Sequence, residues 1–205
     1  TQGIALPPDR DILHTIPQEF IVDTLEKIDN PIGLSGRRLE GHVHLVTAST
    51  SGMENLIESA EELGININGL VFKPLASAIP TLTKDEMKLG VSLIDIGSTT
   101  TSIAVFNEGA VRHSAVIPVG SSSITNDIAV MLRISIEEAE KIKIKYASAK
   151  ASLSSQKLEF EVPRSEDNQM ISENELSQYV EARMEEIFQL AFNEIKRAGI
   201  DNNLT

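Results

Sequence analysis

The sequence predicts an α/β fold, and three observations support this expectation. Segments with strand-like alternation or continuous apolar character recur along the chain and are bounded by turn residues. Segments with a helical apolar period begin with Ser and carry Glu three residues later, the spacing of a capping box. An Asp at the end of one apolar strand leads into a turn of Gly, Ser and Thr, a pattern typical of phosphate-binding turns.

The composition narrows the classes of function. The chain has 205 residues, of which 41% are hydrophobic and 23% charged, enough for a buried core in one or two domains. It contains no cysteine, which excludes disulfides, thiolate catalysis and Cys-ligated zinc. With a net charge of -12 it lacks the basic character that phosphate backbones require, so we expect no nucleic-acid partner. No apolar run reaches the roughly 18 residues of a membrane span.

Two strand-like segments dominate the first part of the chain. Residues 16–23 have a strand-like composition, and residues 41–47 alternate apolar and polar side chains as a half-buried strand does. A connection that contains Pro and Gly, residues 30–36, separates them. We expect the two strands to pair.

Helices are expected between these strands and the middle of the chain. Ser51 and Glu54 have capping-box spacing before an apolar face, and Gly64 stands at the C-cap. A short apolar run then leads to Pro74 and the start of a second helix. The charged segment 84–88 is expected to be a loop or a helix end, and we place the main domain boundary there.

A β-meander is predicted after this boundary. Its strands are expected at residues 91–96, 101–106 and 111–119, with an Asn-Glu-Gly turn before the third. The first strand is nearly all apolar, so we expect it to be central in the sheet and buried on both faces.

Three helices and one short strand complete the expected elements. The helices are predicted at residues 124–132, 135–149 and 172–199, and the second and third open with a Ser and Glu in capping-box spacing. The last of them would be roughly 40 Å long. Alternating residues 158–162 predict a strand, followed by a polar loop.

The informative chemistry lies in the turn after the first meander strand, Asp95-Ile96-Gly97-Ser98-Thr99-Thr100. Backbone N–H groups and hydroxyls in such a turn surround a concavity that can bind phosphate. The carboxylate of Asp95 cannot favour a phosphate directly, but Mg²⁺ or its water shell can lie between them. The turn leads into a hairpin and not into a helix, which argues against a Walker loop. The alternative is a polar hairpin turn capped by the Asp.

The order strand, turn, strand, hairpin, strand and helix is that of the ribonuclease-H-like half of an actin-type nucleotide fold. Two further features fit a nucleotide. Gly120 and Ser121 follow the third strand, and Glu140 and Lys143 share one face of a later helix. A carboxylate can accept from ribose hydroxyls, and a Lys can lie beside an adenine. The alternative is an exposed helical ion pair.

Longer motifs carry a family resemblance. The most specific are Ile16-Pro17-Gln18-Glu19-Phe20 and Pro31-Ile32-Gly33-Leu34-Ser35-Gly36. Others are Pro74-Leu75-Ala76-Ser77-Ala78 and Thr125-Asn126-Asp127-Ile128-Ala129. Along nearly its whole length the chain resembles the bacterial cell-division family FtsA, whereas the phosphate turn is generic to the actin-like superfamily.

The resemblance implies an actin-like lobe with part of the inserted subdomain peculiar to FtsA. Residues 1–49 resemble the later part of that subdomain, and residues 50–84 the return into the first actin-like lobe. Residues 85–205 resemble the start of the second lobe with most of its outer subdomain. Family members are longer, so we expect a parent protein whose first phosphate loop and C-terminal membrane-targeting helix lie outside this chain. Membrane binding is then implied only through a helix absent here.

The sequence departs from the family pattern in the turn and at one further position. The family's turn reads Asp-x-Gly-Gly-Gly-Thr-Thr-Asp, whereas Ser98, Thr99 and Ser102 replace two glycines and the second Asp. The added Cβ atoms would crowd a phosphate and restrict positive φ. Lys73 stands where relatives usually carry an acidic residue near the attacking water; it cannot serve as a base but could pair with a terminal phosphate. We therefore expect at most a weak or degenerate ATPase and assign no catalytic residue.

By resemblance, the parent is an adaptor that binds ATP with Mg²⁺, forms actin-like filaments and ties the FtsZ ring to the membrane. Its expected location is the cytoplasmic face of the cell membrane at the division site. The C-terminal tail of FtsZ is expected on the outer part of the second lobe, residues 124–199, and other divisome proteins on the inserted subdomain. Because one half of a cleft supplies only part of the phosphate coordination, ATP binding is expected of the parent and would be weak in this chain.

The main alternative is a pilus-assembly actin-like protein of the PilM type, which has a similar inserted subdomain and often a degenerate phosphate turn. An Hsp70-type chaperone lobe shares the superfamily turn but does not explain the motif at residues 16–20. A sugar or acetate kinase of the same superfamily would require a substrate base from the half of the parent that lies outside this chain. A metal enzyme is not expected, because His14, His42, His44 and His113 form no ligand cluster with carboxylates.

Overall fold

A computed structural model describes residues 5–162 and 169–199 of the chain. These residues form two compact units. The first contains the described residues up to Leu93 together with Ile103–Ser114, and the second contains Ile94–Ser102 and Ala115–Arg197. Each unit is described separately below.

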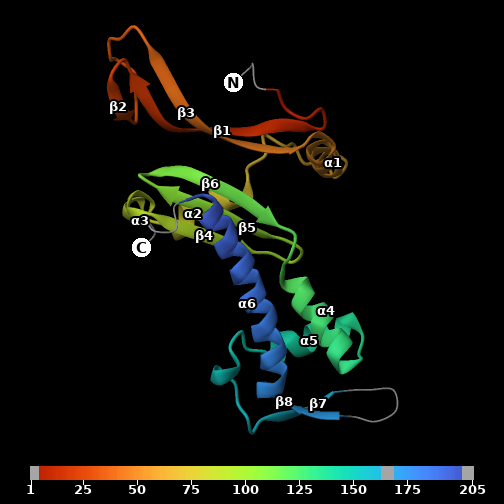
Figure 1. The fold of residues 1–205 in the computed structure, drawn as a ribbon. Helices are drawn as coiled ribbons and strands as arrows, with labels where there is room; N and C mark the ends of the chain where they lie inside the picture. Colours follow the sequence, from red (N-terminus) through yellow and green to blue (C-terminus); the bar gives the residue numbers. More distant parts are fainter. Residues whose placement is uncertain (1–4, 163–168, 200–205) are drawn as a thin grey trace. The chain divides into compact units, whose positions relative to one another are not determined.

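The first unit opens with a three-stranded antiparallel sheet in the order β2-β1-β3 (Figure 1). Strand β1 (Arg10–Val22) pairs with β3 (Leu39–Ser49) along its whole length, which confirms the predicted pairing and extends both strands. The short strand β2 (Leu25–Ile28) was not predicted, because it has only four residues, three of them exposed, and its two apolar residues stand at its ends and do not alternate with polar ones.

Three helices follow the sheet in the first unit. Helix α1 (Thr50–Glu61) is capped by the hydroxyl of Ser49, which accepts from the Gly52 N–H at 3.3 Å. The predicted cap, Ser51, is therefore wrong by two residues, because the chain passes from β3 into the helix without a loop. Helix α2 (Lys73–Thr81) begins with Pro in its first turn, as predicted. The charged segment expected to be a loop or helix end is helix α3 (Lys84–Leu89), which begins with a capping box formed by Thr83 and Glu86.

The predicted meander is confirmed as a sheet with the order β4-β5-β6. Its strands are β4 (Val91–Ile96), β5 (Thr101–Asn107) and β6 (Ala110–Ile117). The expectation that the first strand is central was wrong. In the described part of the chain, β5 is the middle strand and is almost wholly buried, whereas every residue of β4 is half-buried. Two successive hairpin connections place the second strand between the other two, whatever the apolar content of the first.

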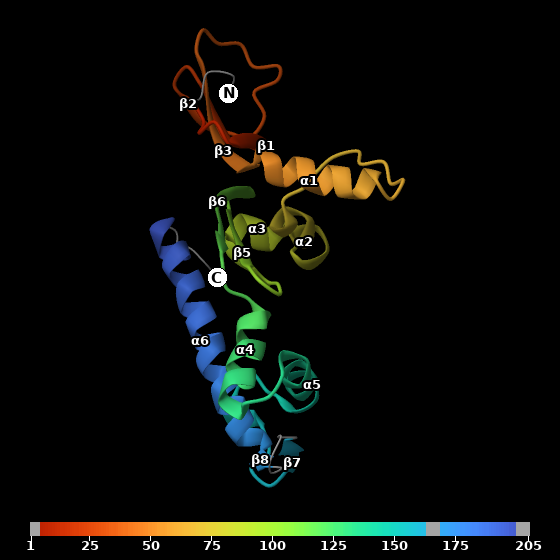
Figure 2. The same ribbon diagram turned by 90° about the vertical axis from the view of Figure 1, so that its right-hand side faces the viewer.

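The second unit contains three helices and a two-stranded sheet. Figure 2 shows α4 and α6 running side by side, with α5 next to α4. Their bounds are α4 (Ser121–Leu132), α5 (Ile136–Tyr146) and α6 (Glu173–Arg197), with a 3₁₀ turn η1 (Ala151–Leu153) and the pair β7 (Glu159–Val162) and β8 (Gln169–Ser172).

Most element predictions for this unit are confirmed. The hydroxyls of Ser135 and Ser172 accept from the backbone N–H groups of Glu138 and Glu175, as the capping-box spacing predicts. Helix α5 ends at Tyr146, three residues before the expected end. The predicted polar loop lies mostly outside the described residues, and β8 beyond it was not predicted.

Each unit has its own apolar core. In the first, Ala78, Ala104, Phe106 and Val111 are buried together, and Ile16 of β1 packs against them. In the second, the core joins α4, α5 and α6 to the β7–β8 pair, with Ile128, Val162 and Leu176 fully buried. Helix α6 has 25 residues, about 38 Å at 1.5 Å per residue. One stripe of it is buried, formed by Leu176, Val180, Ile187, Ala191 and Ile195, whereas Phe188 is 50% exposed.

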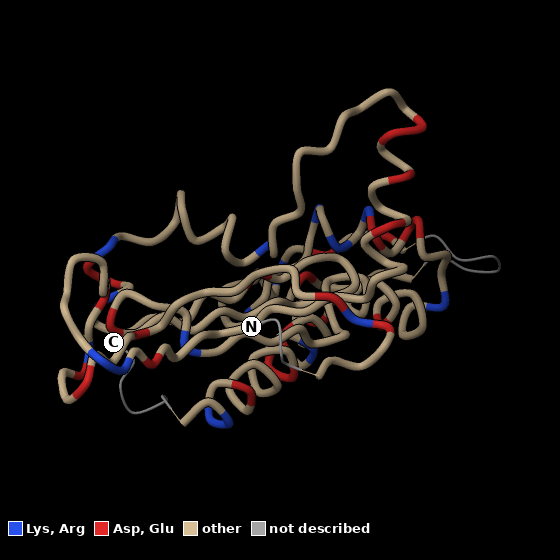
Figure 3. The backbone as a smooth tube through the Cα atoms, turned by 90° about the horizontal axis from the view of Figure 1, so that it is seen from above, with Lys and Arg blue, Asp and Glu red and all other residues tan. Residues whose placement is uncertain are grey.

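Charge is spread over most elements of both units. Figure 3 shows acidic positions in red interleaved with basic positions in blue along the backbone. None of the helices in the described part of the chain combines the length and hydropathy of a membrane span.

Candidate functional site

The predicted phosphate turn lies between β4 and β5 in the second unit. The Gly97 N–H donates to the Thr100 carbonyl at 2.9 Å and closes the turn. Asp95, in β4, is half-buried, and Ser98, Thr99 and Thr100 are exposed. The described non-glycine residues with positive φ are elsewhere in the chain, so Ser98 and Thr99 need no left-handed conformation. The expected conflict between these side chains and the turn's backbone therefore does not occur.

The carbonyl groups of the turn cap the start of α4. The backbone N–H groups of Ser121 and Ser122 donate to the carbonyls of Gly97 and Ser98 at 2.9 and 2.8 Å. The Ser122 hydroxyl donates to the same Ser98 carbonyl at 2.7 Å. The first N–H groups of a helix have no partner within it, so these contacts satisfy donors that would otherwise need water or a ligand.

Gly120 makes this close approach possible. A Cβ atom at position 120 would lie 2.5 Å from the Ser98 carbonyl oxygen and 2.6 Å from that of Gly97. Both obstacles are backbone atoms, which cannot rotate away. The φ of Gly120 is -153°, which any residue can adopt, so the requirement for glycine is steric.

Glu140 and Lys143 form part of a polar cluster between α4 and α5. The Lys143 ammonium lies 2.6 Å from the Glu140 carboxylate and donates to the Thr125 hydroxyl at 2.8 Å and to the Ser121 carbonyl at 3.4 Å. The Thr125 hydroxyl also lies 2.5 Å from Glu140. The Lys143 side chain is only 16% exposed, so the pair is not a free surface ion pair. Hydrogen bonds from Lys143 and Thr125 lower the pKa of Glu140.

The structure thus brings together most of the predicted nucleotide residues. Gly97, Ser98, Gly120 and Ser121 are in direct contact, and Lys143 reaches Ser121. Lys73 is the exposed first residue of α2 and lies in the first unit.

The donor chemistry of the turn fits a phosphate-bound Mg²⁺ better than a protein-held metal. In the described part of the chain, no three His, Asp or Glu side chains are grouped closely enough to hold a metal ion. Mg²⁺ commonly uses one or two carboxylates, and nucleotide phosphates and water supply its other ligands. Asp95 can provide such a carboxylate, and the exposed turn beside it leaves access for phosphate.

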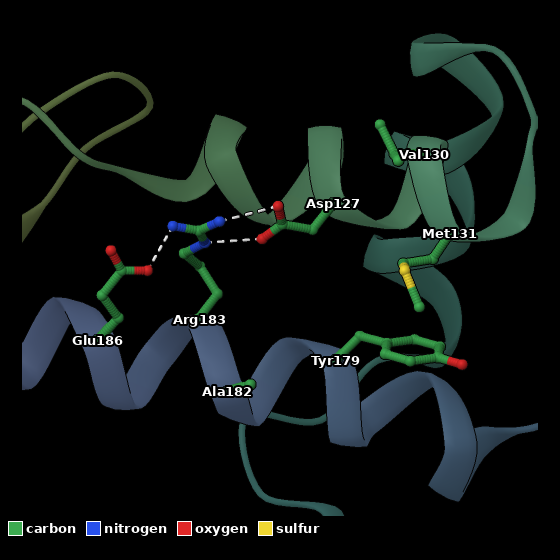
Figure 4. Close-up of a pocket in the computed structure, with 7 residues that line it drawn as sticks. All are labelled: Asp127, Val130, Met131, Tyr179, Ala182, Arg183 and Glu186. Carbon is green, nitrogen blue, oxygen red and sulfur yellow. Dashed lines mark hydrogen bonds and ion pairs between the residues drawn. The ribbon is translucent and has the colours of Figure 1, made fainter.

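A second site, not predicted residue by residue, lies between α4 and α6. It is a pocket of about 330 Å³ with an apolar side formed by Val130, Met131, Tyr179 and Ala182. Its other side is charged and contains Asp127, Arg183 and Glu186 (Figure 4). Val130 and Met131 are 76% and 51% exposed, so the apolar wall is open to a partner.

Arg183 is held in a fixed orientation at the edge of this pocket. Its guanidinium donates to both carboxylate oxygens of Asp127 on α4, from Nε at 2.7 Å and from Nη2 at 2.9 Å. It also forms an ion pair with Glu186, one turn further along α6. The hydrogen bonds to Asp127 raise the pKa of Arg183. A bidentate pair of this kind restricts both geometry and mobility.

The sequence contained a partial signal for this pocket. Tyr179, Ala182, Arg183 and Glu186 are spaced three or four residues apart and therefore share one face of a helix. Nothing in the sequence indicated that α4 would pack beside this face, so Arg183 was not identified.

Comparison with known proteins identifies the family. The sequence model described as "Cell division protein FtsA" matches residues 92–200, and the model of the "SHS2 domain inserted in FTSA" matches residues 1–47. The chain belongs to the FtsA family. The FtsA of Pseudomonas aeruginosa is 41% identical over 203 residues, which are 98% of this chain and 49% of that protein. The FtsA of Bacillus subtilis is 38% identical over 97% of this chain and 46% of its own length. The chain thus spans about half the length of these FtsA relatives.

Solved structures show an actin-like fold. MreB5 of Spiroplasma citri bound to AMPPNP gives a TM-score of 0.59 at 21% identity, over 73% of this chain and 48% of that one. A PilM–PilN pilus biogenesis complex gives 0.54 at 18% identity, over 71% and 40%. These likenesses confirm the predicted actin-like lobe. The PilM alternative shares the fold, whereas the sequence matches are to FtsA.

The contact at Gly120 generates a first prediction. Gly120→Ala should lower the free energy of unfolding by about 1–3 kcal/mol, because the added methyl group meets two fixed carbonyls. Gly69→Ala is the matched control, since a Cβ there meets nothing within 4 Å. Urea denaturation measures both variants, and equal stability of the two would contradict the predicted overlap.

The Glu140 cluster predicts a pH dependence. The pKa of Glu140 is lowered from 4.5 in the folded chain, so its contribution is present above that value and is lost as the pH falls through the folded-state pKa. Glu140→Gln should cost about 1 kcal/mol or less at pH 7, since the carboxylate is partly exposed, and the difference from wild type should shrink in acid. Glu137→Gln, on the solvent side of α5, is the control; a Glu140 effect that is constant from pH 7 to pH 3 would refute the assignment.

Proposed function

We propose that the chain serves in a cell-division adaptor that binds nucleotide, assembles into actin-like filaments and connects the FtsZ ring to the membrane and divisome. In this proposal, the second unit carries phosphate contacts and the site for the FtsZ tail. The sheet of β1, β2 and β3 is the surface for other divisome proteins, and the adaptor acts at the membrane of the division site. No nucleic-acid partner is proposed, in keeping with the net charge of -12.

The nucleotide proposal is supported by the turn between β4 and β5. The exposed Ser98–Thr100 segment lies beside Asp95, and exposed hydroxyls next to a carboxylate suit a Mg²⁺-bound phosphate. Fold neighbours have been solved with AMPPNP and with ADP. Because the exposed Cβ atoms of Ser98 and Thr99 lie on the side open to a ligand, we propose binding with weak or absent hydrolysis.

The α4–α6 pocket is the observation that carries the FtsZ proposal. It lies within the region expected for the FtsZ tail, and it combines an open apolar wall with a fixed arginine. Apolar side chains of a short peptide would bury against Met131 and Tyr179, and polar groups of the peptide would lie beside the charged side of the pocket. An amphipathic tail segment has this combination of groups.

Nucleotide binding is tested by titration calorimetry of Mg·ATP into the complete gene product. We expect binding in the micromolar range or weaker, a loss of at least about tenfold in Asp95→Asn, and little hydrolysis. Asp85→Asn, on the exposed first turn of α3, is the matched control. Ordinary metal-dependent turnover of ATP would overturn the expectation of weak hydrolysis, and absence of binding would overturn the nucleotide proposal.

The FtsZ site is tested with a fluorescent peptide of the C-terminal tail of FtsZ from the same organism. Met131→Glu places a charge on the apolar wall and should raise the Kd about tenfold or more. Ile144→Glu is the matched control, because Ile144 is also an exposed apolar residue but lies on α5, outside the pocket. Equal loss of affinity in both variants, or in neither, would argue against this pocket.

A further inference from the structure

Helix α4 contacts both sites of the second unit. Its first residues bond to the Gly97–Ser98 turn, and Asp127, Val130 and Met131 face the pocket beside α6. From Ser122 to Asp127 is five residues, about 7.5 Å along the helix axis. The two sites are therefore joined by one short element with no loop between them.

A bound anion would compete with the hydrogen bonds that join the start of α4 to the turn. In this structure Ser121 and Ser122 give their N–H groups to the turn's carbonyls, and the Ser122 hydroxyl adds a third bond. A phosphate is a stronger acceptor than a carbonyl at a helix N-terminus, and it repels carbonyl oxygens that point at the same donors. A phosphate bound at the turn would therefore compete for these three hydrogen bonds.

The middle of α4 is stiff enough to transmit such a change. Thr125 is bonded to Glu140 and Lys143 of α5, while Ile128 and Leu132 are buried in the core of the unit. A helix packed in this way shifts as a body by small sliding movements and does not unravel from one end. Displacement at Ser122 is then carried to Asp127.

The downstream contacts respond to the same movement. Asp127 holds Arg183 by two hydrogen bonds, and such bidentate geometry tolerates little displacement. A shift of α4 against α6 would loosen this pair and move Val130 and Met131 relative to Tyr179. The charged and apolar sides of the pocket would change together.

We propose that α4 couples the Gly97–Ser98 turn to the α4–α6 pocket, so that phosphate binding at the turn changes the affinity of the pocket for an apolar peptide. The coupling rests on the proposed function for its two ligands, and by thermodynamic reciprocity the peptide changes nucleotide affinity by the same factor. The physical link itself exists without either ligand.

The link is tested first in the ligand-free chain. Ser122→Ala removes one hydrogen bond to Ser98, and Ser123→Ala is the matched control, since the Ser123 hydroxyl has no hydrogen bond in the described part of the chain. Exchange of the Arg183 Nε–H with solvent, measured by NMR, should be about 2- to 10-fold faster in Ser122→Ala than in Ser123→Ala. A factor of this size is expected when the loss of one hydrogen bond at Ser122 weakens the Asp127–Arg183 pair. Equal exchange in the two variants overturns the proposal.

A second experiment tests the link from the pocket to the turn and leaves position 122 unchanged. Asp127→Asn should accelerate exchange of the Ser122 amide, whereas Glu186→Gln, which keeps the Asp127 contact with Arg183, should not. An unchanged Ser122 amide in Asp127→Asn would also overturn the link.

The ligand arm uses the complete gene product with the FtsZ tail peptide and Mg·ATP. We expect Mg·ATP to change the peptide Kd by about 5-fold or more, and Ser122→Ala to reduce this factor. If both ligands bind and the Kd is unchanged, the coupling fails while the proposed function stands. If one ligand does not bind, the proposed function fails at that site, and the exchange measurements still decide the link.

Discussion

The structure of the second unit depends on the capping of α4 by the turn between β4 and β5. Two backbone carbonyls and the start of a helix approach one another so closely that only glycine fits at position 120. This contact fixes where α4 begins and in which direction it leaves the sheet strands. The positions of Thr125, Asp127 and the buried residues of α4 follow from that starting point, as does the alignment of α4 with α5 and α6.

Different forces hold the two sides of α4. Toward the core, Ile128 and Leu132 bury apolar surface, which contributes about 1.5–3 kcal/mol for each fully buried side chain. At its polar edges, α4 contacts the Glu140–Lys143 pair of α5 through Thr125, and Arg183 of α6 through Asp127. These groups remain partly exposed, and such pairs contribute about 1 kcal/mol or less. Apolar burial therefore stabilises the helix packing, whereas the ion pairs determine orientation. The pair with Asp127 therefore fixes the direction in which the Arg183 side chain points at the pocket.

Local sequence signals predicted most elements, and three-dimensional neighbours explain the exceptions. Capping serines at 135 and 172 and the apolar stripe of α6 were predictable because each depends on residues three or four positions apart. The central strand was assigned wrongly because the nearly all-apolar pattern of β4 reflects partial burial of both its faces, whereas the order of strands in the sheet depends on the connections between them. Arg183 was not identified because its partner Asp127 lies 56 residues away on another helix.

The structure changes how the substitutions in the predicted phosphate turn are interpreted. The sequence alone predicts that Ser98 and Thr99 disturb a glycine-rich turn. In the structure their φ values are not in the left-handed region and their side chains are exposed, so the turn itself tolerates them. The position that does not tolerate a side chain is Gly120, where the turn meets the helix. Steric constraint is therefore concentrated at the junction with α4, whereas positions 98 and 99 lie on an exposed surface where side chains are accommodated. The same turn thus combines a position that requires glycine with positions that tolerate substitution, because only the first is packed against backbone atoms.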